Sequence, residues 1–221
     1  GQWGPILVRQ LHNTPLARVR WVCDLDAKRL AEVAARFPDV PLTRDPHEAI
    51  ADPVVDAVLV ATPPMNHRLL LRRALHRGKH VFVEKPFATS VEDAVALTDL
   101  ARSRERTLMV GHVFVYNAAV RYIKGLLDGG ELGRVYYASA TRTGPGPVRS
   151  DVNVAWDLAS QDIAITNLWF NGPPLAVSAT GVDWIQNGLS DAVFATLTYP
   201  EDVRVQLQAS WVAPRRVREV S

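Results

Sequence analysis

The sequence predicts an α/β fold in its first half and an α+β fold with a mostly antiparallel open sheet in its second half. In the first half, short apolar runs alternate with amphipathic runs, as they do in βαβ units of a parallel sheet. These apolar runs are almost continuous, which is typical of strands covered on both faces. In the second half, strand-like runs follow one another, and Pro200-Glu201-Asp202 joins the last two, a connection typical of an antiparallel hairpin.

The elements of the first half are marked by helix caps. Strands and helices are expected in alternation over 18–23, 26–37, 56–62, 66–78, 80–84, 90–105 and 107–112. Leu30 and Val33 fall on one face of the first helix, as in an amphipathic helix. Gly78 ends the second helix, and Ser90 with Asp93 forms a capping box at the start of the third.

The second half changes in texture after about residue 112. Its expected elements are a helix over 117–127, a strand over 134–143, a Gly/Pro-rich loop, a helix over 157–170, and strands over 175–185, 191–200 and 203–212. We therefore expect two domains, a dinucleotide-binding domain over 1–114 and a substrate-binding or oligomerisation domain over 115–221.

Composition excludes several classes of protein. The 25 basic and 23 acidic residues leave a charge of only +2, which argues against a nucleic-acid partner. One cysteine rules out an intrachain disulfide, and the histidines have no metal-binding spacing, so no metal is expected. No apolar run is long enough to span a membrane, and no signal peptide is evident. We expect a soluble cytoplasmic protein without a membrane partner.

The start of the chain carries part of a dinucleotide-binding pattern. Gly1 and Gly4 have the spacing of the last two glycines in G-x-G-x-x-G, and Pro5 suits a first helical turn. Asp24 follows the next strand, where an acidic residue accepts hydrogen bonds from the adenosine ribose and repels a 2′-phosphate. A Rossmann-type domain that prefers NAD to NADP is predicted. The alternative is a loop glycine, a capping glycine and a surface acid.

Four motifs resemble the Gfo/Idh/MocA family of nicotinamide-dependent oxidoreductases. They are, in chain order, "GQWGP", "ATPPMNH" (61–67), "VEKPFA" (83–88) and "WDLASQDI" (156–163). The resemblance implies hydride transfer at a hydroxyl or ketone of a sugar, cyclitol or nucleotide-linked sugar. The sequence around "RSDVN" and "WDLA" is most similar to that of family members that act on nucleotide-activated amino or acetamido sugars. Because family members are longer, it also implies that this chain is truncated at both ends and lacks its first strand.

The resemblance also assigns site residues in the first domain. Lys85 follows a strand at the edge where parallel sheets bind ligands, and it becomes the principal acid/base, with a cis bond to the proline after it. The residues implied in cofactor binding are Gly1, Gly4, Asp24, Thr62, Pro63, His67, Glu84, Lys85 and Asn117.

In the second domain the resemblance points to Asp157 and to the position four residues later. The family usually has a histidine there, which takes the proton from the carbinol, but this chain has Gln161. An amide donates and accepts hydrogen bonds without titrating. Three readings stay open: Lys85 is the sole acid/base with Asp157 tuning it, the base comes from elsewhere, such as Tyr116 or Tyr137, or the protein binds NAD without redox chemistry.

Substrate and subunit contacts are less specific. Arg149, together with Arg142, has the chemistry to bind a carboxylate or diphosphate, although two solvated arginines explain the pattern equally well. The residues expected to contact substrate are Lys85, Tyr116, Arg149, Asp157 and Gln161. The resemblance implies a homodimer or homotetramer formed through the C-terminal sheet. A lyase or glycosidase with transient internal hydride transfer is a further enzymatic alternative.

Overall fold

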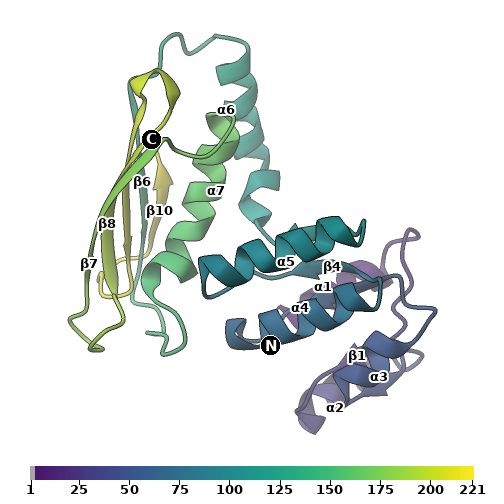
Figure 1. Ribbon diagram of the computed structural model, residues 1–221. Coiled ribbons are helices and arrows are strands. Elements are labelled where there is room, and N and C mark those ends of the chain that lie inside the picture. Colours follow the sequence, from purple (N-terminus) through teal and green to yellow (C-terminus); the bar gives the residue numbers. More distant parts are fainter. Residues whose placement is uncertain (1–2) are drawn as a thin grey trace. The chain divides into compact units, whose positions relative to one another are not determined.

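The computed structural model describes residues 3–221, so Gly1 lies outside the described residues. The chain divides into two compact units, one ending at Gly111 and the other running from His112 to Ser221. This division falls slightly before the boundary predicted after residue 114. Each unit has its own sheet and its own helices (Figure 1).

The first unit alternates strands and helices, and all its paired strands are parallel. Its elements are α1 (Gly4–His12), β1 (Val22–Cys23), α2 (Ala27–Arg36), β2 (Leu42–Thr43), α3 (Pro46–Ala51), β3 (Ala57–Val60), η1 (Pro64–Asn66), α4 (His67–His76), β4 (His80–Val83), α5 (Val91–Ser103) and β5 (Leu108–Val110). Strands β3, β4 and β5 form one sheet, with β4 in the centre, and β1 and β2 form another. The predicted Rossmann-type architecture is confirmed.

Local caps explain where these helices begin and end. The side chain of Asp26 accepts a hydrogen bond from the Lys28 N–H at the start of α2, and that of Ser90 accepts from the Asp93 N–H at the start of α5. Gly78 follows α4 with a φ of +70°, a conformation that favours glycine. The glycine predicted at the end of α4 is therefore confirmed, as is the Ser90 half of the capping box predicted for α5.

Two short elements, β2 and α3, were not predicted. Helix α3 has only six residues, too few for a clear hydrophobic period. Its signal is instead the cap, because Asp45 accepts from the His47 N–H at 2.8 Å and Pro46 occupies the first turn. Strand β1 is shorter than the predicted run over 18–23, since only two of its residues pair with β2.

The second unit is a five-stranded sheet with helices on one face (Figure 1). Its elements are η2 (Val113–Tyr116), α6 (Ala118–Asp128), β6 (Tyr137–Thr143), η3 (Ala155–Ala159), α7 (Ser160–Trp169), β7 (Ala176–Val182), β8 (Ala192–Thr198), η4 (Pro200–Asp202), β9 (Arg204–Ser210) and β10 (Val217–Val220). The strand order is β10-β6-β9-β8-β7, and only the β6–β9 pair is parallel. The mostly antiparallel sheet and the β8–β9 hairpin are confirmed.

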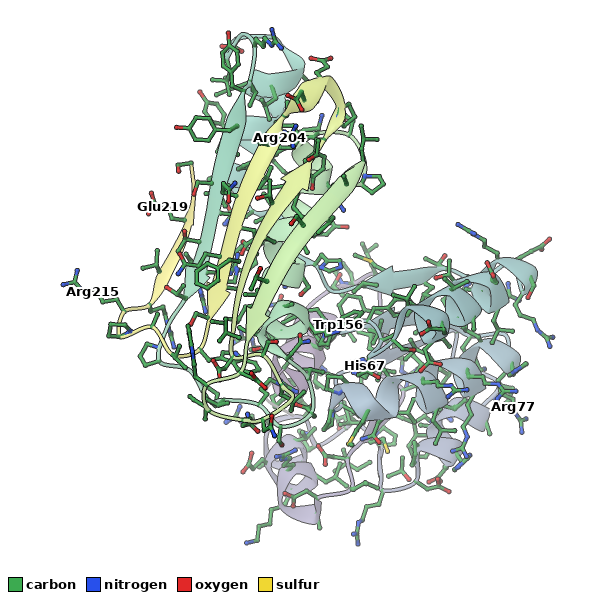
Figure 2. The ribbon with its side chains drawn as sticks, turned by 60° about the vertical axis from the view of Figure 1, so that its left-hand side comes forward. His67, Arg77, Trp156, Arg204, Arg215 and Glu219 are labelled. Atoms are coloured by element: carbon green, nitrogen blue, oxygen red, sulfur yellow. The ribbon has the colours of Figure 1, made fainter. Side chains whose placement is uncertain are left out.

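Alternation along the strands divides this sheet into two faces. On the inner face, Val205 is fully buried and Leu207 is 4% exposed, and they pack with Tyr199 and the residues of η3. Tyr199 donates a hydrogen bond to Asn167 at 2.7 Å, which ties the β8 end to α7. On the outer face, Arg204 projects away from the helices (Figure 2). The inner face is therefore the core of the second unit.

Within residues 3–221, no helix combines the length and the apolar character needed to cross a bilayer.

Candidate functional site

The start of α1 has the features of a phosphate-binding turn. A Cβ added at Gly4 would meet no atom within 4 Å, so internal packing does not require glycine there. Trp3 at the N-cap provides no side-chain acceptor for the first-turn N–H groups. Backbone N–H groups at a helix start, together with the helix dipole, favour an anion such as a pyrophosphate. The described part of this turn thus fits the phosphates of a dinucleotide.

Asp24 lies directly after β1, at the carboxyl end of that strand. Its side chain is 24% exposed, with Oδ2 3.7 Å from Nη1 of Arg29, and Oδ1 accepts a hydrogen bond from the Asp26 N–H at 3.0 Å. These contacts hold the carboxylate while leaving part of it open to solvent. The placement fits an acceptor for ribose hydroxyls.

Lys85 is the second residue after β4, between Glu84 and a cis peptide bond to Pro86. Glu84 is only 7% exposed, and its carboxylate lies so close to Gly111 that an added Cβ would be 3.2 Å from Oε2. Burial raises the pKa of Glu84, and the backbone N–H and positive charge of Lys85 oppose this rise. Lys85 itself is half-buried. The lysine is therefore held at the ligand-binding edge of the β3–β4–β5 sheet.

His67 connects two loops that follow neighbouring strands of this sheet. Its ring is fully buried at the start of α4 (Figure 2), with Nδ1 3.0 Å from the Pro86 carbonyl oxygen and Nε2 2.9 Å from the Thr62 carbonyl oxygen. The predicted direct contact of His67 with a cofactor is thus corrected, because both ring nitrogens face the protein. Thr62 and Pro63 themselves are exposed. His67 instead positions the loop that carries them relative to the loop of Lys85.

Replacing His67 with asparagine is expected to loosen both loops. The shorter amide cannot reach both carbonyl groups, and a buried polar group left without its partner costs about 1–3 kcal/mol. Urea unfolding should show a loss of stability of about this size, and calorimetry should show weaker NAD binding. His76→Asn, at the exposed end of the same helix, is the matched control. Unchanged stability in His67→Asn would contradict the positioning role.

In the second unit, Asp157 lies in η3, which is a π-helical turn rather than part of a regular α-helix. Such turns often occur at functional sites. The Asp157 carboxylate is 14% exposed, with Oδ1 3.9 Å from Nη1 of Arg149, and Oδ2 accepts a hydrogen bond from the Trp211 indole at 3.2 Å. The neighbouring Trp156 marks this turn in Figure 2. The carboxylate is thus held just before the N-terminal end of α7.

Gln161 follows in the first turn of α7 and is 5% exposed. Its Oε1 is buried and has no hydrogen-bond partner among the described residues. Buried polar atoms without partners are uncommon and call for an explanation, such as an absent ligand. Gln161 Oε1 is therefore a candidate acceptor for a ligand hydroxyl.

Arg149 was expected to contact substrate, while Arg142 was left open between anion binding and a solvated side chain. Arg142 is buried and forms a two-pronged ion pair with Asp162, Nε to Oδ2 at 2.8 Å and Nη2 to Oδ1 at 2.5 Å, so it is neither solvated nor available to a substrate anion. Arg149 is 33% exposed and makes a similar pair with Asp151, at 2.8 and 2.6 Å. This pair raises the pKa of Arg149 and lowers that of Asp151. The strand and helix positions alone did not reveal these partners.

Two further predicted residues lie where η2 meets α6. Asn117 caps α6, because its side chain accepts a hydrogen bond from the Ala119 N–H at 2.9 Å. Tyr116 is 56% exposed, and the guanidinium of Arg121 lies 4.9 Å from its ring centroid. The side-chain oxygen of Asn117 is therefore used in the helix cap. The Tyr116 ring is largely open to solvent.

The chain thus combines a Rossmann-type α/β unit with a second, α+β unit. The family model "Oxidoreductase family, NAD-binding Rossmann fold" matches residues 1–112, and the model of the GFO/IDH/MocA C-terminal domain matches residues 120–220. The chain belongs to the Gfo/Idh/MocA family, as the sequence motifs predicted.

Several relatives give this membership more detail. The chain is 31% identical over 211 residues to UDP-N-acetylglucosamine 3-dehydrogenase from Acidithiobacillus ferrooxidans, covering 93% of this chain and 63% of the relative. The solved structure of that protein matches with a TM-score of 0.79 at 30% identity, over 93% of this chain and 63% of that one. Inositol 2-dehydrogenase from Rhodococcus jostii is 31% identical over 160 residues, 70% of this chain and 43% of the relative. The chain thus spans less than two thirds of these relatives.

Proposed function

We propose that this protein is an NAD-dependent oxidoreductase that transfers a hydride between the nicotinamide and a ring hydroxyl or ketone of a sugar or nucleotide sugar. The observation that carries the proposal is the position of Lys85, two residues after β4 in the unit that matches the NAD-binding family model. The names of the relatives, which include UDP-N-acetylglucosamine 3-dehydrogenase and inositol 2-dehydrogenase, support the substrate class. NAD is proposed over NADP because the Asp24 carboxylate would repel a 2′-phosphate.

The proposal gives each polar residue of the site a separate task. The bound nicotinamide supplies the hydride acceptor or donor. Lys85 exchanges a proton with the reacting oxygen, because an amine can act as a general acid or base. The Asp157 carboxylate accepts a hydrogen bond from the reacting hydroxyl or from the Lys85 ammonium. It thereby orients the hydroxyl and the ammonium for proton transfer. Gln161 Oε1 accepts a hydrogen bond from a substrate hydroxyl without titrating.

The proposed mechanism needs Lys85 and Asp157 to meet at one substrate. They belong to different units, so their convergence is part of the proposal. It also carries over Gly1, Gly4, Thr62, Pro63 and Asn117 to the cofactor and Tyr116 and Arg149 to the substrate. Of these, the Asn117 side chain already caps α6, so its proposed contact would use the amide nitrogen.

The activity is tested directly by incubating the full-length protein with NAD and UDP-N-acetylglucosamine, or with inositol as the polyol alternative. We expect reduced nicotinamide to accumulate, as followed by its absorbance, with one of these substrates and more slowly with NADP. NAD binding measured by calorimetry is the parallel control. Binding of NAD without turnover of any sugar or polyol would contradict the proposal.

Gln161 favours a second candidate function, an NAD-binding homologue without redox activity. The position that usually bears a proton acceptor holds an amide that cannot titrate. Loss of a general base costs about 10²–10⁴ in rate and does not abolish catalysis by itself. Gln161→His separates the candidates, because a gain in turnover indicates a weakened enzyme. A lyase or glycosidase with internal hydride transfer would instead release product without net reduction of NAD.

We propose that two or four copies assemble through the outer face of the C-terminal sheet. Phe194 and Tyr137, whose side chains lie on this face, are 44% and 70% exposed. The rest of the face is mostly threonine, serine and glutamine. Unpaired aromatic side chains on a flat sheet suit an isologous interface.

A further inference from the structure

We propose that Trp211 is a positioning residue for Asp157, and that its indole N–H fixes the orientation of this carboxylate. This inference rests on the proposed function, in which Asp157 acts at the reacting oxygen. It adds a residue from the end of β9 to the residues of the η3–α7 segment in the second unit.

The tryptophan is itself held rigidly. Trp211 directly follows β9, is 3% exposed and belongs to the core cluster of the second unit. Its backbone N–H donates to the Asp191 carbonyl oxygen at 3.0 Å. A buried aromatic ring with its backbone fixed in this way has little rotational freedom. The indole Nε1 therefore presents its proton to Asp157 Oδ2, 3.2 Å away, from a fixed direction.

The second carboxylate oxygen faces a different group. Arg149 Nη1 lies 3.9 Å from Asp157 Oδ1, while the guanidinium is anchored by its two hydrogen bonds to Asp151. The side-chain amide of Gln186 donates to the Arg149 carbonyl oxygen at 2.7 Å and holds the backbone of that loop. Asp157 Oδ2 thus accepts from a neutral donor, the Trp211 indole, while Oδ1 lies near the positive charge of Arg149.

The chemistry of the indole suits a positioning role. Tryptophan is a hydrogen-bond donor only and does not titrate, so it orients a carboxylate without exchanging a proton with it. The terminal torsion of aspartate is broad, and a fixed donor restricts it. With Oδ2 held by Trp211, the plane of the Asp157 carboxylate keeps one orientation. A preoriented acceptor contributes more to the transition state than a freely rotating one.

The contact is tested first by nuclear magnetic resonance on the full chain, without any substrate. The Trp211 indole signal is identified among those of the six tryptophans as the one missing in Trp211→Phe. We expect Asp157→Asn to shift this signal. Trp169 is the matched control, because it is 7% exposed and its indole donates to the Val120 carbonyl oxygen at 2.9 Å. A Trp211 signal that moves no more than the Trp169 signal overturns the proposal.

The positioning role is tested by kinetics with the same variants. Trp211→Phe keeps the ring and removes the N–H, and we expect kcat to fall about tenfold with an unchanged KM for NAD, the size of effect expected for a hydrogen bond to a charged group. In an Asp157→Asn background, the second change should cost little more. Trp169→Phe should leave kcat unchanged. An equal loss in Trp169→Phe, or full additivity with Asp157→Asn, overturns the role.

The two tests also separate this inference from the proposed function. If Asp157→Asn shifts the Trp211 indole signal but leaves turnover intact, the contact stands and the proposed role of Asp157 fails. If Asp157→Asn abolishes turnover while Trp211→Phe retains full kcat, the proposed function stands and the positioning role fails.

Discussion

Lys85→Met should reduce kcat by about 10²–10⁴, the usual contribution of a general acid or base, while NAD binding is retained. Lys85 lies two residues after the end of β4, and Gln161 provides no titrating substitute in the second unit. Lys85→Arg sharpens the test, because arginine keeps the positive charge but does not release a proton near neutral pH. If proton transfer is the role of Lys85, both variants lose turnover to a similar degree.

The control for this experiment is Lys124→Met. Lys124 lies on α6, where its ammonium pairs with Asp128 and donates to Asn171 at 2.9 Å. It has no place in the proposed site, so its loss should leave kcat unchanged. If Lys85→Arg retained most of the turnover, the residue would act through its charge, and the proton would have to come from another group.

The first unit shows how far local sequence signals determine structure. The caps at Ser90 and Gly78 were readable because each depends on a few neighbouring residues. Helix α3 was missed because six residues cannot display a hydrophobic period, although Asp45 followed by Pro46 is a helix-start signal. In the second unit, strand β10 was missed because its four residues form a strand only through pairing with β6.

The candidate site divides in the same way. Lys85 and Asp24 were placed correctly after their strands, since the sequence itself shows a polar residue following an apolar run. The partners of His67, Arg142 and Asp157 were not visible, because each contact joins residues 5 to 54 positions apart. A sequence of this kind identifies residues with suitable chemistry, and packing then decides which of them face a ligand and which face the protein.

Arg142→Met is expected to destabilise the second unit by about 3–5 kcal/mol, since removing one partner of a buried ion pair leaves the other charge uncompensated. The side chains of Arg142 and Asp162 are only 8% and 1% exposed. The guanidinium also lies 4.6 Å from the ring centroid of Phe114, and this stacking would be lost as well. Urea unfolding of the variant measures the loss.

Arg204→Met is the matched control, because Arg204 lies on a neighbouring strand and pairs with Asp202 at 2.5 Å in an exposed setting, where ion pairs contribute about 0–1 kcal/mol.

The double variant Arg142→Met/Asp162→Leu should recover most of the stability, since apolar side chains of similar size often replace a buried pair without loss. A loss below about 1 kcal/mol in Arg142→Met would mean that Asp162 finds another partner or water. Because Asp162 adjoins Gln161, we expect the ion pair also to hold α7 in the rotation that places Gln161. The double variant should therefore regain stability without fully regaining kcat, which would show that the pair is retained for orientation of the site as well as for folding.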